Sequence, residues 1–447
     1  MSHRMWRWFS VWLPLSHRER GMGGEVGGTG GNFYGQSILG AVMASAEIEL
    51  RGHIIDSFIL PRIWGAIEEA GAHFHVREMR IGQSETETSY ARMEVFADSQ
   101  RLLDDLLPEL QRLGAELAEE QNARTERVTQ TGVLPDDFYS TTNLPTEVRV
   151  GGAWLPVADI EMDVAIVIAS DGKSARTVPM HEAQVGDAVV VGYEGVRIEA
   201  QQRPRQREVF GFMQSPVSSE RAKALAIREV ADAMIAARQR GAKILWVLGP
   251  AIVHTAARGS VAELVRRGYA QVIFGGNAIV AHDAEAAMFG TSLGINLTTG
   301  LPVEHGHRNH LRAINKVRSL GSLEAAHNAG LLGDGIVAAS LEHGVELVLA
   351  GSIRDDGPMP GVITDTMVAQ GRMRAAARGV EAAIMAASML HAIATGNLLP
   401  ASVRTVVVDI NPAVVTKLAD RGSAQVMGLV TDVELFLSAL VDALPAS

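Results

Sequence analysis

The chain contains no cysteine. Disulfide bonds, cysteine-ligated zinc, iron–sulfur clusters and thiolate nucleophiles are therefore excluded, and the composition fits a cytoplasmic protein. Aromatic residues make up only 5% of the chain while 45 of its 447 residues are glycine, which is typical of α/β domains packed with small side chains. No apolar run reaches the roughly 18 residues that span a bilayer, so we expect no membrane partner.

Positive charge is also scarce. The formal net charge is −11 at pH 7, which argues against a nucleic-acid or anionic-membrane surface because both require a basic face. A chain of 447 residues is too long for one ordinary core, so two or three domains are expected.

The pattern of apolar residues divides the chain into four parts. Residues 1–46, basic and then glycine-rich, are expected to be a disordered extension. Residues 47–135 alternate as strand, helix, two strands and helix, which indicates an α+β domain of the ferredoxin or ACT type. Residues 136–215 show short strands broken by glycine and proline, which indicates a small β-rich domain and linker. Because α+β modules of this type often pair subunits or bind small ligands, we expect a homo-oligomer.

Residues 216–447 have a different character. Continuous apolar runs predict buried strands at 243–249, 270–276, 345–352, 404–410 and 424–430, and helices are expected between them, including one over the alanine-rich residues 375–394. Strands buried on both faces and alternating with helices indicate a doubly wound parallel sheet, that is, a C-terminal Rossmann-like domain. Ligands of such sheets bind at the carboxyl ends of the strands.

Three predicted strand ends carry candidate ligand-binding residues. Gly275 and Gly276 lead into a helix at Asn277 and Ala278, where backbone N–H groups could approach a pyrophosphate, although a tight turn between strand and helix has the same sequence. Asp409 ends a buried strand and could accept the ribose hydroxyls of NAD while repelling the 2′-phosphate of NADP. Asn411 and Pro412 behind it also fit a helix cap followed by the first helical residue. At the third end, Asp355 and Asp356 follow Arg354 and could do acid–base work or bind an amine, or form a solvated turn.

The segment Val303–Asn315, VEHGHRNHLRAIN, raises the question of a metal site. It contains Glu304, Arg308 and three histidines spaced two and three residues apart across a predicted helix start, which is poor spacing for ligands on one rigid element. We therefore expect no metal. A polar active-site loop that includes His307, with Lys316 one turn into the following helix, competes with a purely structural loop.

The stretch GTSLG, Gly290–Gly294, matches the G-x-S-x-G pattern of a hydrolase nucleophile elbow. A predicted helix precedes Ser292 where that motif requires a strand, so we do not expect a serine hydrolase.

Four segments in combination, GGNAIVAHD, EHGHRNHLRAINKVRS, VLAGSIRDDGPMP and VVVDINP, resemble the lysine-oxoglutarate reductase/saccharopine dehydrogenase conserved-domain family. The resemblance is to its archaeal-type ornithine cyclodeaminases and to the C-terminal part of cyanobacterial arginine dihydrolase/ornithine cyclodeaminase. It spans roughly residues 47–444 and implies an NAD-binding domain of the deoxyhypusine-synthase type, which would account for the absence of a G-x-G-x-x-G motif. The dihydrolase activity of the fused members uses a cysteine nucleophile, so guanidine hydrolysis is not expected here.

The resemblance also implies particular site residues. The NAD contacts would be Asn277, Ala278, Asp355, Met389, Leu390, His391, Asp409, Asn411, Pro412 and Asp432.

The implied reaction is the NAD-dependent conversion of ornithine to proline and ammonia. Lys316 or Arg308 would bind the substrate carboxylate, Asp356 or Glu304 the δ-amine, and His307 would move protons. Two alternatives stay open: a net NAD-dependent amino-acid or imino-acid oxidoreductase, and a non-catalytic NAD-binding amino-acid sensor.

Overall fold

The computed structural model describes residues 44–55, 57–83, 87–118, 121–199, 223–353, 355, 357–421 and 426–446, the side chains of 419–421 excepted. The extension expected over residues 1–46 therefore lies outside the described residues as far as residue 43. From Ala44 onward the chain forms a strand, so the first domain begins three residues before the predicted boundary. Pairing of Ala44 with Ala97 across the sheet accounts for the earlier start.

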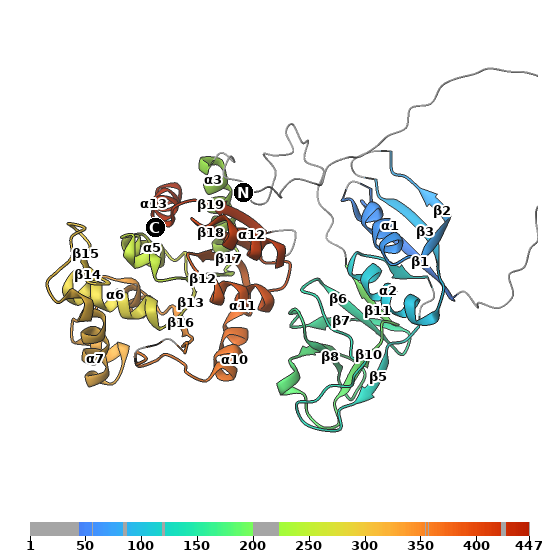
Figure 1. The fold of residues 1–447 in the computed structure, drawn as a ribbon, viewed down its shortest axis with the longest axis horizontal. Helices are drawn as coiled ribbons and strands as arrows, with labels where there is room; N and C mark the ends of the chain where they lie inside the picture. Colours follow the sequence, from blue (N-terminus) through green and yellow to red (C-terminus); the bar gives the residue numbers. More distant parts are fainter. Residues whose placement is uncertain are drawn as a thin grey trace, which may run out of the picture. The chain divides into compact units, whose positions relative to one another are not determined.

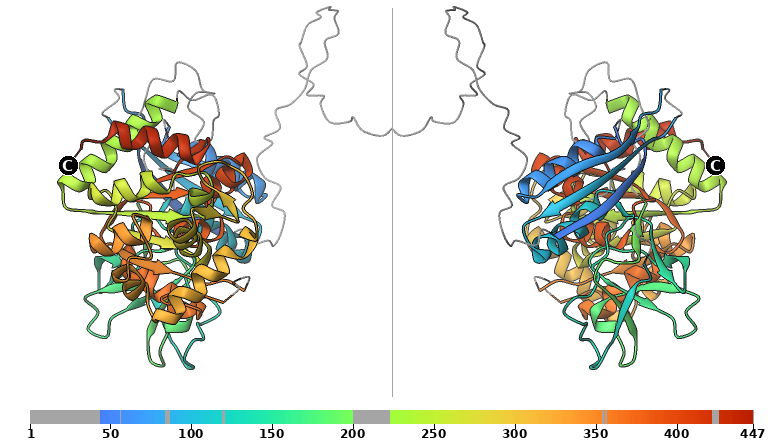
Figure 2. Two further views of the ribbon diagram at one scale, coloured as in Figure 1. Left: turned by 90° about the vertical axis from the view of Figure 1, so that its left-hand side faces the viewer. Right: turned by 90° about the vertical axis from the view of Figure 1, so that its right-hand side faces the viewer.

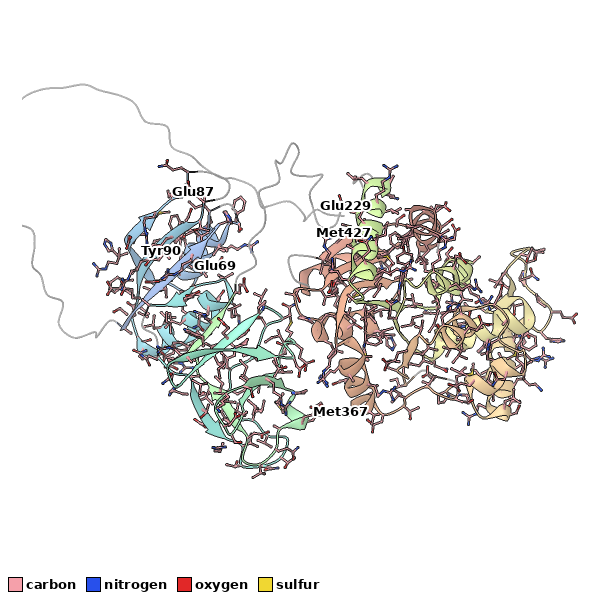
Figure 3. The ribbon with its side chains drawn as sticks, turned by 180° about the vertical axis from the view of Figure 1, so that it is seen from behind. Glu69, Glu87, Tyr90, Glu229, Met367 and Met427 are labelled. Carbon is pink, nitrogen blue, oxygen red and sulfur yellow. The ribbon has the colours of Figure 1, made fainter. Side chains whose placement is uncertain are left out.

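The first domain is an α+β sandwich. Its elements are β1 (Ala44–Gly52), α1 (Ile59–Glu69), β2 (His73–Arg80), β3 (Ser89–Ala97), α2 (Gln100–Arg112) and β4 (Glu116–Leu117). The four strands are antiparallel in the order β2-β3-β1-β4, which is the ferredoxin-like arrangement. The two-residue strand β4 was not predicted. The right-hand view of Figure 2 shows the blue strands side by side, and Tyr90 on β3 is labelled in Figure 3.

The second domain is a sheet of seven short strands. They are β5 (Arg124–Arg127), β6 (Thr146–Val150), β7 (Ala153–Ala158), β8 (Ala165–Ile168), β9 (Ala175–Val178), β10 (Ala188–Val191) and β11 (Val196–Ile198). β5 pairs with β10 and so belongs to this sheet, although residues 124–127 fall inside the predicted first domain. All four β5 residues are exposed, so the sequence offers no apolar alternation to reveal the strand.

The third domain contains six parallel strands in the order β16-β13-β12-β17-β18-β19. Their bounds are β12 (Lys243–Leu248), β13 (Val272–Gly275), β16 (Glu346–Leu349), β17 (Val380–Ala386), β18 (Arg404–Asp409) and β19 (Val426–Val430). Numbered along the chain, the order is 3-2-1-4-5-6, the doubly wound order of dinucleotide-binding domains. The predicted parallel sheet is confirmed.

One strand of this sheet was assigned wrongly from the sequence. Residues 380–386 read as part of an alanine-rich helix, but they form β17 between β12 and β18. The left-handed backbone of Gly379 (φ 79°) separates β17 from the preceding helix. Six of its seven residues are buried, so sheet pairing and burial override the helical propensity of alanine.

Helices cover both faces of the sheet (Figure 1). On one face, the sheet shares a hydrophobic core with α3 (Lys223–Gln239), α4 (Ala251–His254), α5 (Arg258–Arg266), α6 (Asn277–Phe289), α7 (Asn309–Leu320), α8 (Leu323–Asn328), α9 (Ile336–Glu342) and α13 (Val433–Ala443). Within this core, α7 packs against α6, and α8 packs against α7 and α9. The other packs against α10 (Thr366–Ala377), α11 (Leu390–Leu398) and α12 (Pro412–Arg421). The left-hand view of Figure 2 shows α13 and α3 crossing this domain near the C-terminus.

A two-stranded hairpin, β14 (Thr291–Ser292) with β15 (Ile295–Asn296), lies between α6 and α7. The hairpin joins α6, which begins at the end of β13, to the histidine-rich segment Val303–Asn315. It therefore connects the candidate NAD-binding residues at the strand ends to the candidate catalytic residues.

Candidate functional site

The ends of β12 and β17 lie side by side at the point where the strand order reverses. A Cβ on Gly249, directly after β12, would come within 1.6 Å of the carbonyl oxygen of Ala387, directly after β17. Ala387 itself has a left-handed backbone (φ 50°), which is uncommon for a residue with a side chain. These strand ends bound the crevice in which doubly wound sheets bind nucleotides.

The turn after β13 packs against a histidine of α11. Gly276 caps α6, and a Cβ there would lie 3.1 Å from Cε1 of His391. Nε2 of His391, in the first turn of α11, lies 3.1 Å from the carbonyl oxygen of Ala350 after β16. His391, on the helix that follows β17, therefore contacts residues at the ends of β13 and β16. The neighbouring Met389 and Leu390 are exposed.

Asn277 has a structural task at the same end. It is buried, and its Oδ1 accepts the backbone N–H of Met359 at 2.8 Å. This bond ties the start of α6 to the loop that follows β16. In that loop, Asp355 accepts the backbone N–H of Ser352 at 2.8 Å. Arg354 and Asp356 lie outside the described residues.

The ends of β18 and β19 carry helix caps. Asn411 Oδ1 accepts the N–H of Ala413 at 3.0 Å and Pro412 opens α12, so the capping interpretation of Asn411 and Pro412 is confirmed. Oδ1 of Asp409 accepts the N–H of Asn411 at 2.8 Å, and its Oδ2 has no hydrogen-bond partner among the described residues. Asp432 accepts the N–H groups of Glu434 and Leu435 as the cap of α13.

The catalytic candidates lie on the surface of the histidine-rich segment. Glu304, His307, Arg308 and Lys316 are all exposed, and no side-chain bond joins them to the strand ends within the described part of the chain. The predicted helix start is right, since α7 begins at Asn309. Arg318 Nη1 donates to the carbonyl oxygen of Pro358 at 2.9 Å, which connects α7 to the loop beyond β16.

A buried polar cluster lies beneath this segment and was not predicted. His254 Nδ1 lies 2.7 Å from Ser292 Oγ, and His282 Nδ1 lies 2.8 Å from Glu285 Oε2. The rings of His254 and His282 meet edge to face at 4.7 Å. His282 and Glu285 are spaced i, i+3 on the otherwise largely apolar helix α6, and this spacing was the available sequence signal. Their partners come from α4, β14 and α7, which the sequence could not bring together.

Ser292 pairs with a histidine but lacks the geometry of a hydrolase nucleophile. It lies in β14, directly after α6, rather than on a turn from strand to helix. The adjacent N–H groups of Leu293 and Gly294 donate to Glu285, so they do not form a free oxyanion hole. The sequence argument against a serine hydrolase and the structure agree.

Two groups of the cluster have shifted pKa values. Burial, together with the nearby His282, lowers the pKa of His254 from 6.5 to about 4. Burial also raises the pKa of Glu285, but hydrogen bonds from His282, Gly294 and Thr291 outweigh it and bring the net value below the ordinary 4.5. The cluster therefore holds an ionised carboxylate and a neutral imidazole at neutral pH.

These shifts predict acid sensitivity of folding. In the unfolded chain His254 takes up a proton below pH 6.5, whereas in the folded chain it does so only near pH 4. Protonation therefore favours the unfolded chain, and the free energy of unfolding falls as the pH drops from 6.5 to 4. We expect a loss on the order of 1–3 kcal/mol from this group, because solvent screens part of the effect at a half-buried ring, measured by urea unfolding at pH 7 and pH 4.5. His254→Gln should flatten the slope, whereas exposed His343→Gln should not. Equal slopes in wild type and His254→Gln would contradict the assignment.

Comparisons with known proteins agree with this architecture. The model of the LOR/SDH bifunctional enzyme conserved region matches residues 45–144. Two models of the C-terminal part of ArgZ-like arginine dihydrolases match residues 145–440, the first region over 145–227 and the Rossmann fold over 228–440. The ornithine cyclodeaminase of Methanothermobacter thermautotrophicus is 47% identical over 400 residues, covering 89% of this chain and 97% of that one. The chain belongs to the archaeal-type ornithine cyclodeaminase family.

Solved structures extend the family assignment. The apo structure of the cyanobacterial arginine dihydrolase ArgZ is 39% identical with a TM-score of 0.80, and the match covers 91% of this chain and 59% of ArgZ. A LOR/SDH protein from Methanococcus maripaludis S2 is 43% identical with a TM-score of 0.69, covering 72% of this chain and 98% of the other. Among the described residues, no helix is long and apolar enough to cross a bilayer.

Proposed function

We propose that this chain is an ornithine cyclodeaminase that uses NAD to convert ornithine to proline and ammonia without net redox change. The observation that carries the proposal is the 47% identity, over nearly the full length, to a relative named ornithine cyclodeaminase. The doubly wound strand order and the residues at its carboxyl edge support a dinucleotide cofactor.

The described residues fit NAD in three respects. Gly276 has no side chain at the start of the 13-residue helix α6, which favours a pyrophosphate there. Asp409 has one carboxylate oxygen without a partner among the residues that the structure describes, and this oxygen suits a ribose hydroxyl. The absence of a side chain at Gly249 lets the ends of β12 and β17 approach each other closely beside the crevice. The other contacts that we propose are those of Asn277, Ala278, Asp355, Met389, Leu390, His391, Asn411, Pro412 and Asp432.

NAD, when bound, supplies the hydride acceptor and donor for the α-carbon of the substrate. The chain's own residues bind and orient ornithine and move its protons. We propose that Arg308 or Lys316 binds the α-carboxylate and that Glu304 or Asp356 binds the δ-amine. His307 takes a proton from an ammonium group and returns it to the departing ammonia, since an imidazole can do both near neutral pH.

The test is a balance of products. With NAD far below the substrate concentration, ornithine should be consumed completely and should give proline and ammonia in equal amounts, measured by chromatography and an ammonia assay. NADH accumulating in step with ornithine loss would instead show a net oxidoreductase. Dinucleotide binding without turnover of ornithine would show a non-catalytic sensor.

A further inference from the structure

Glu285 is a fully buried carboxylate that bonds to His282 on its own helix and to three residues of the segment 291–294. Its side chain is 0% exposed on α6. Oε1 accepts from the Thr291 hydroxyl at 2.8 Å and from the Gly294 N–H at 3.0 Å, and Oε2 accepts from the Leu293 N–H at 3.2 Å. With His282, which lies 2.8 Å from Oε2, the carboxylate has four hydrogen-bond partners. A buried charge is costly unless it is fully hydrogen-bonded, so the three bonds from residues 291–294 hold the β14–β15 hairpin in one conformation.

The hairpin in turn holds the histidine-rich segment. The carbonyl oxygen of Gly294 accepts the N–H of Val303 at 2.9 Å. Gly294 and Gly306 touch backbone to backbone: a Cβ on Gly294 would lie 2.5 Å from the carbonyl carbon of Gly306 and 2.7 Å from the nitrogen of His307. The residue that bonds to Glu285 therefore packs directly against the residue before His307.

The far end of the segment is fixed by the same carboxylate. Thr291, which donates its hydroxyl to Glu285, accepts the side-chain amide of Asn309 at 3.0 Å. Asn309 is buried and opens α7. Both ends of residues 303–309 are thus tied, through one intermediate residue each, to Glu285.

Glu285 also orients a histidine. Its ionised carboxylate accepts a hydrogen bond from Nδ1 of His282 and so favours the tautomer with the proton on Nδ1. In this tautomer Nε2 is unprotonated. The titratable groups facing His282 are His254 on α4, His310 on α7 at 5.9 Å between ring centroids, and Glu285 itself. Nδ1 of His310 is buried and has no partner among the described residues.

We propose that Glu285 is a positioning residue of the reaction: its buried carboxylate sets the conformation of residues 303–309 and thereby the place of Glu304, His307 and Arg308. The inference rests on the proposed function, because that function assigns those three side chains to the substrate. A displacement of about 1 Å in such groups can lower a rate about 100-fold, so the loss of the anchor should reduce turnover more than binding.

The test variant is Glu285→Gln, which keeps the volume and one acceptor oxygen but removes the charge and the second acceptor. The matched control is Asp283→Asn, two residues away on α6. Asp283 is equally buried, but it pairs with Arg258 at 2.5 Å and caps α9 through the N–H groups of Ile336 and Val337. Within the described part of the chain, its hydrogen bonds do not reach the hairpin. Thr291→Val is a milder second variant should Glu285→Gln fold poorly.

For each variant we would measure kcat per folded enzyme, KM for ornithine, Kd for NAD and hydrogen–deuterium exchange of residues 303–309. Glu285→Gln should lower kcat roughly 10- to 100-fold, leave the NAD Kd within about twofold, and speed exchange in the segment. Thr291→Val should change the same quantities in the same direction by smaller factors. Asp283→Asn should lower stability without changing kcat or that exchange.

Unchanged kcat and exchange in Glu285→Gln, or equal losses of kcat in Glu285→Gln and Asp283→Asn, would overturn the positioning role. The proposed function fails separately, if the wild type makes no proline. The exchange measurement still decides in that case whether Glu285 holds the segment.

Discussion

Replacing His307 by alanine is expected to lower the turnover of ornithine roughly 100- to 10,000-fold, the range typical of losing a general acid–base group. His307 is exposed within residues 303–309, the segment that the β14–β15 hairpin holds, and its backbone nitrogen lies against Gly294. The Kd for NAD should stay within about twofold, because no strand end contacts this side chain within the described part of the chain. Steady-state kinetics and equilibrium titration of NAD measure the two quantities.

The control for this substitution is His305→Asn in the same segment. His305 is exposed and has a left-handed backbone (φ 59°), which asparagine tolerates better than alanine. Its turnover should match that of the wild type. If His307→Ala turns over ornithine at the wild-type rate, the segment is structural and the proton carrier lies elsewhere.

Replacing Asp409 by asparagine is expected to weaken NAD binding roughly 10- to 100-fold, as expected for a lost hydrogen bond to a charged group. The wild type should prefer NAD to NADP strongly, because the carboxylate repels the 2′-phosphate. Asparagine keeps an oxygen to accept the N–H of Asn411, so the start of α12 should survive. The affinities for both dinucleotides, measured in wild type and variant, give the discrimination.

Asp365→Asn is the matched control for Asp409→Asn. Asp365 caps α10 through the N–H groups of Met367 and Val368, whereas Asp409 ends β18, and Figure 3 labels Met367 on α10. Its substitution should leave the ratio of the two affinities unchanged. Equal affinity of the wild type for NAD and NADP would rule out the role of Asp409.

The strand ends could be located from the sequence because their signals are local. Gly275 and Gly276 follow an apolar run, and Asp409, Asn411 and Pro412 follow another, so both ends are visible without knowledge of the fold. β17 was missed because its alanines favour a helix when considered alone, and only pairing with β12 and β18 makes them a strand. β4 has only two residues and β5 is exposed along its whole length, so periodicity detects neither strand.

The Glu285 cluster shows a different limit. His254 and Asn309 are more than fifty residues apart in the chain. Asn309 reaches Glu285 through Thr291, and His254 bonds to Ser292, the next residue of β14. Sequence spacing identifies the pair His282 and Glu285 on one face of α6 but says nothing about what that face meets. A polar pair on a buried helix face is therefore a useful sequence signal, and its partners require the fold.

The most direct measurement of the central claim follows the α-hydrogen of the substrate. Ornithine deuterated at the α-carbon should give proline that keeps most of its deuterium at that carbon, without transfer of label into added NAD, because the same hydride leaves and returns within one closed site. Complete loss of the deuterium to solvent, read by mass spectrometry of the proline, would contradict internal hydride transfer.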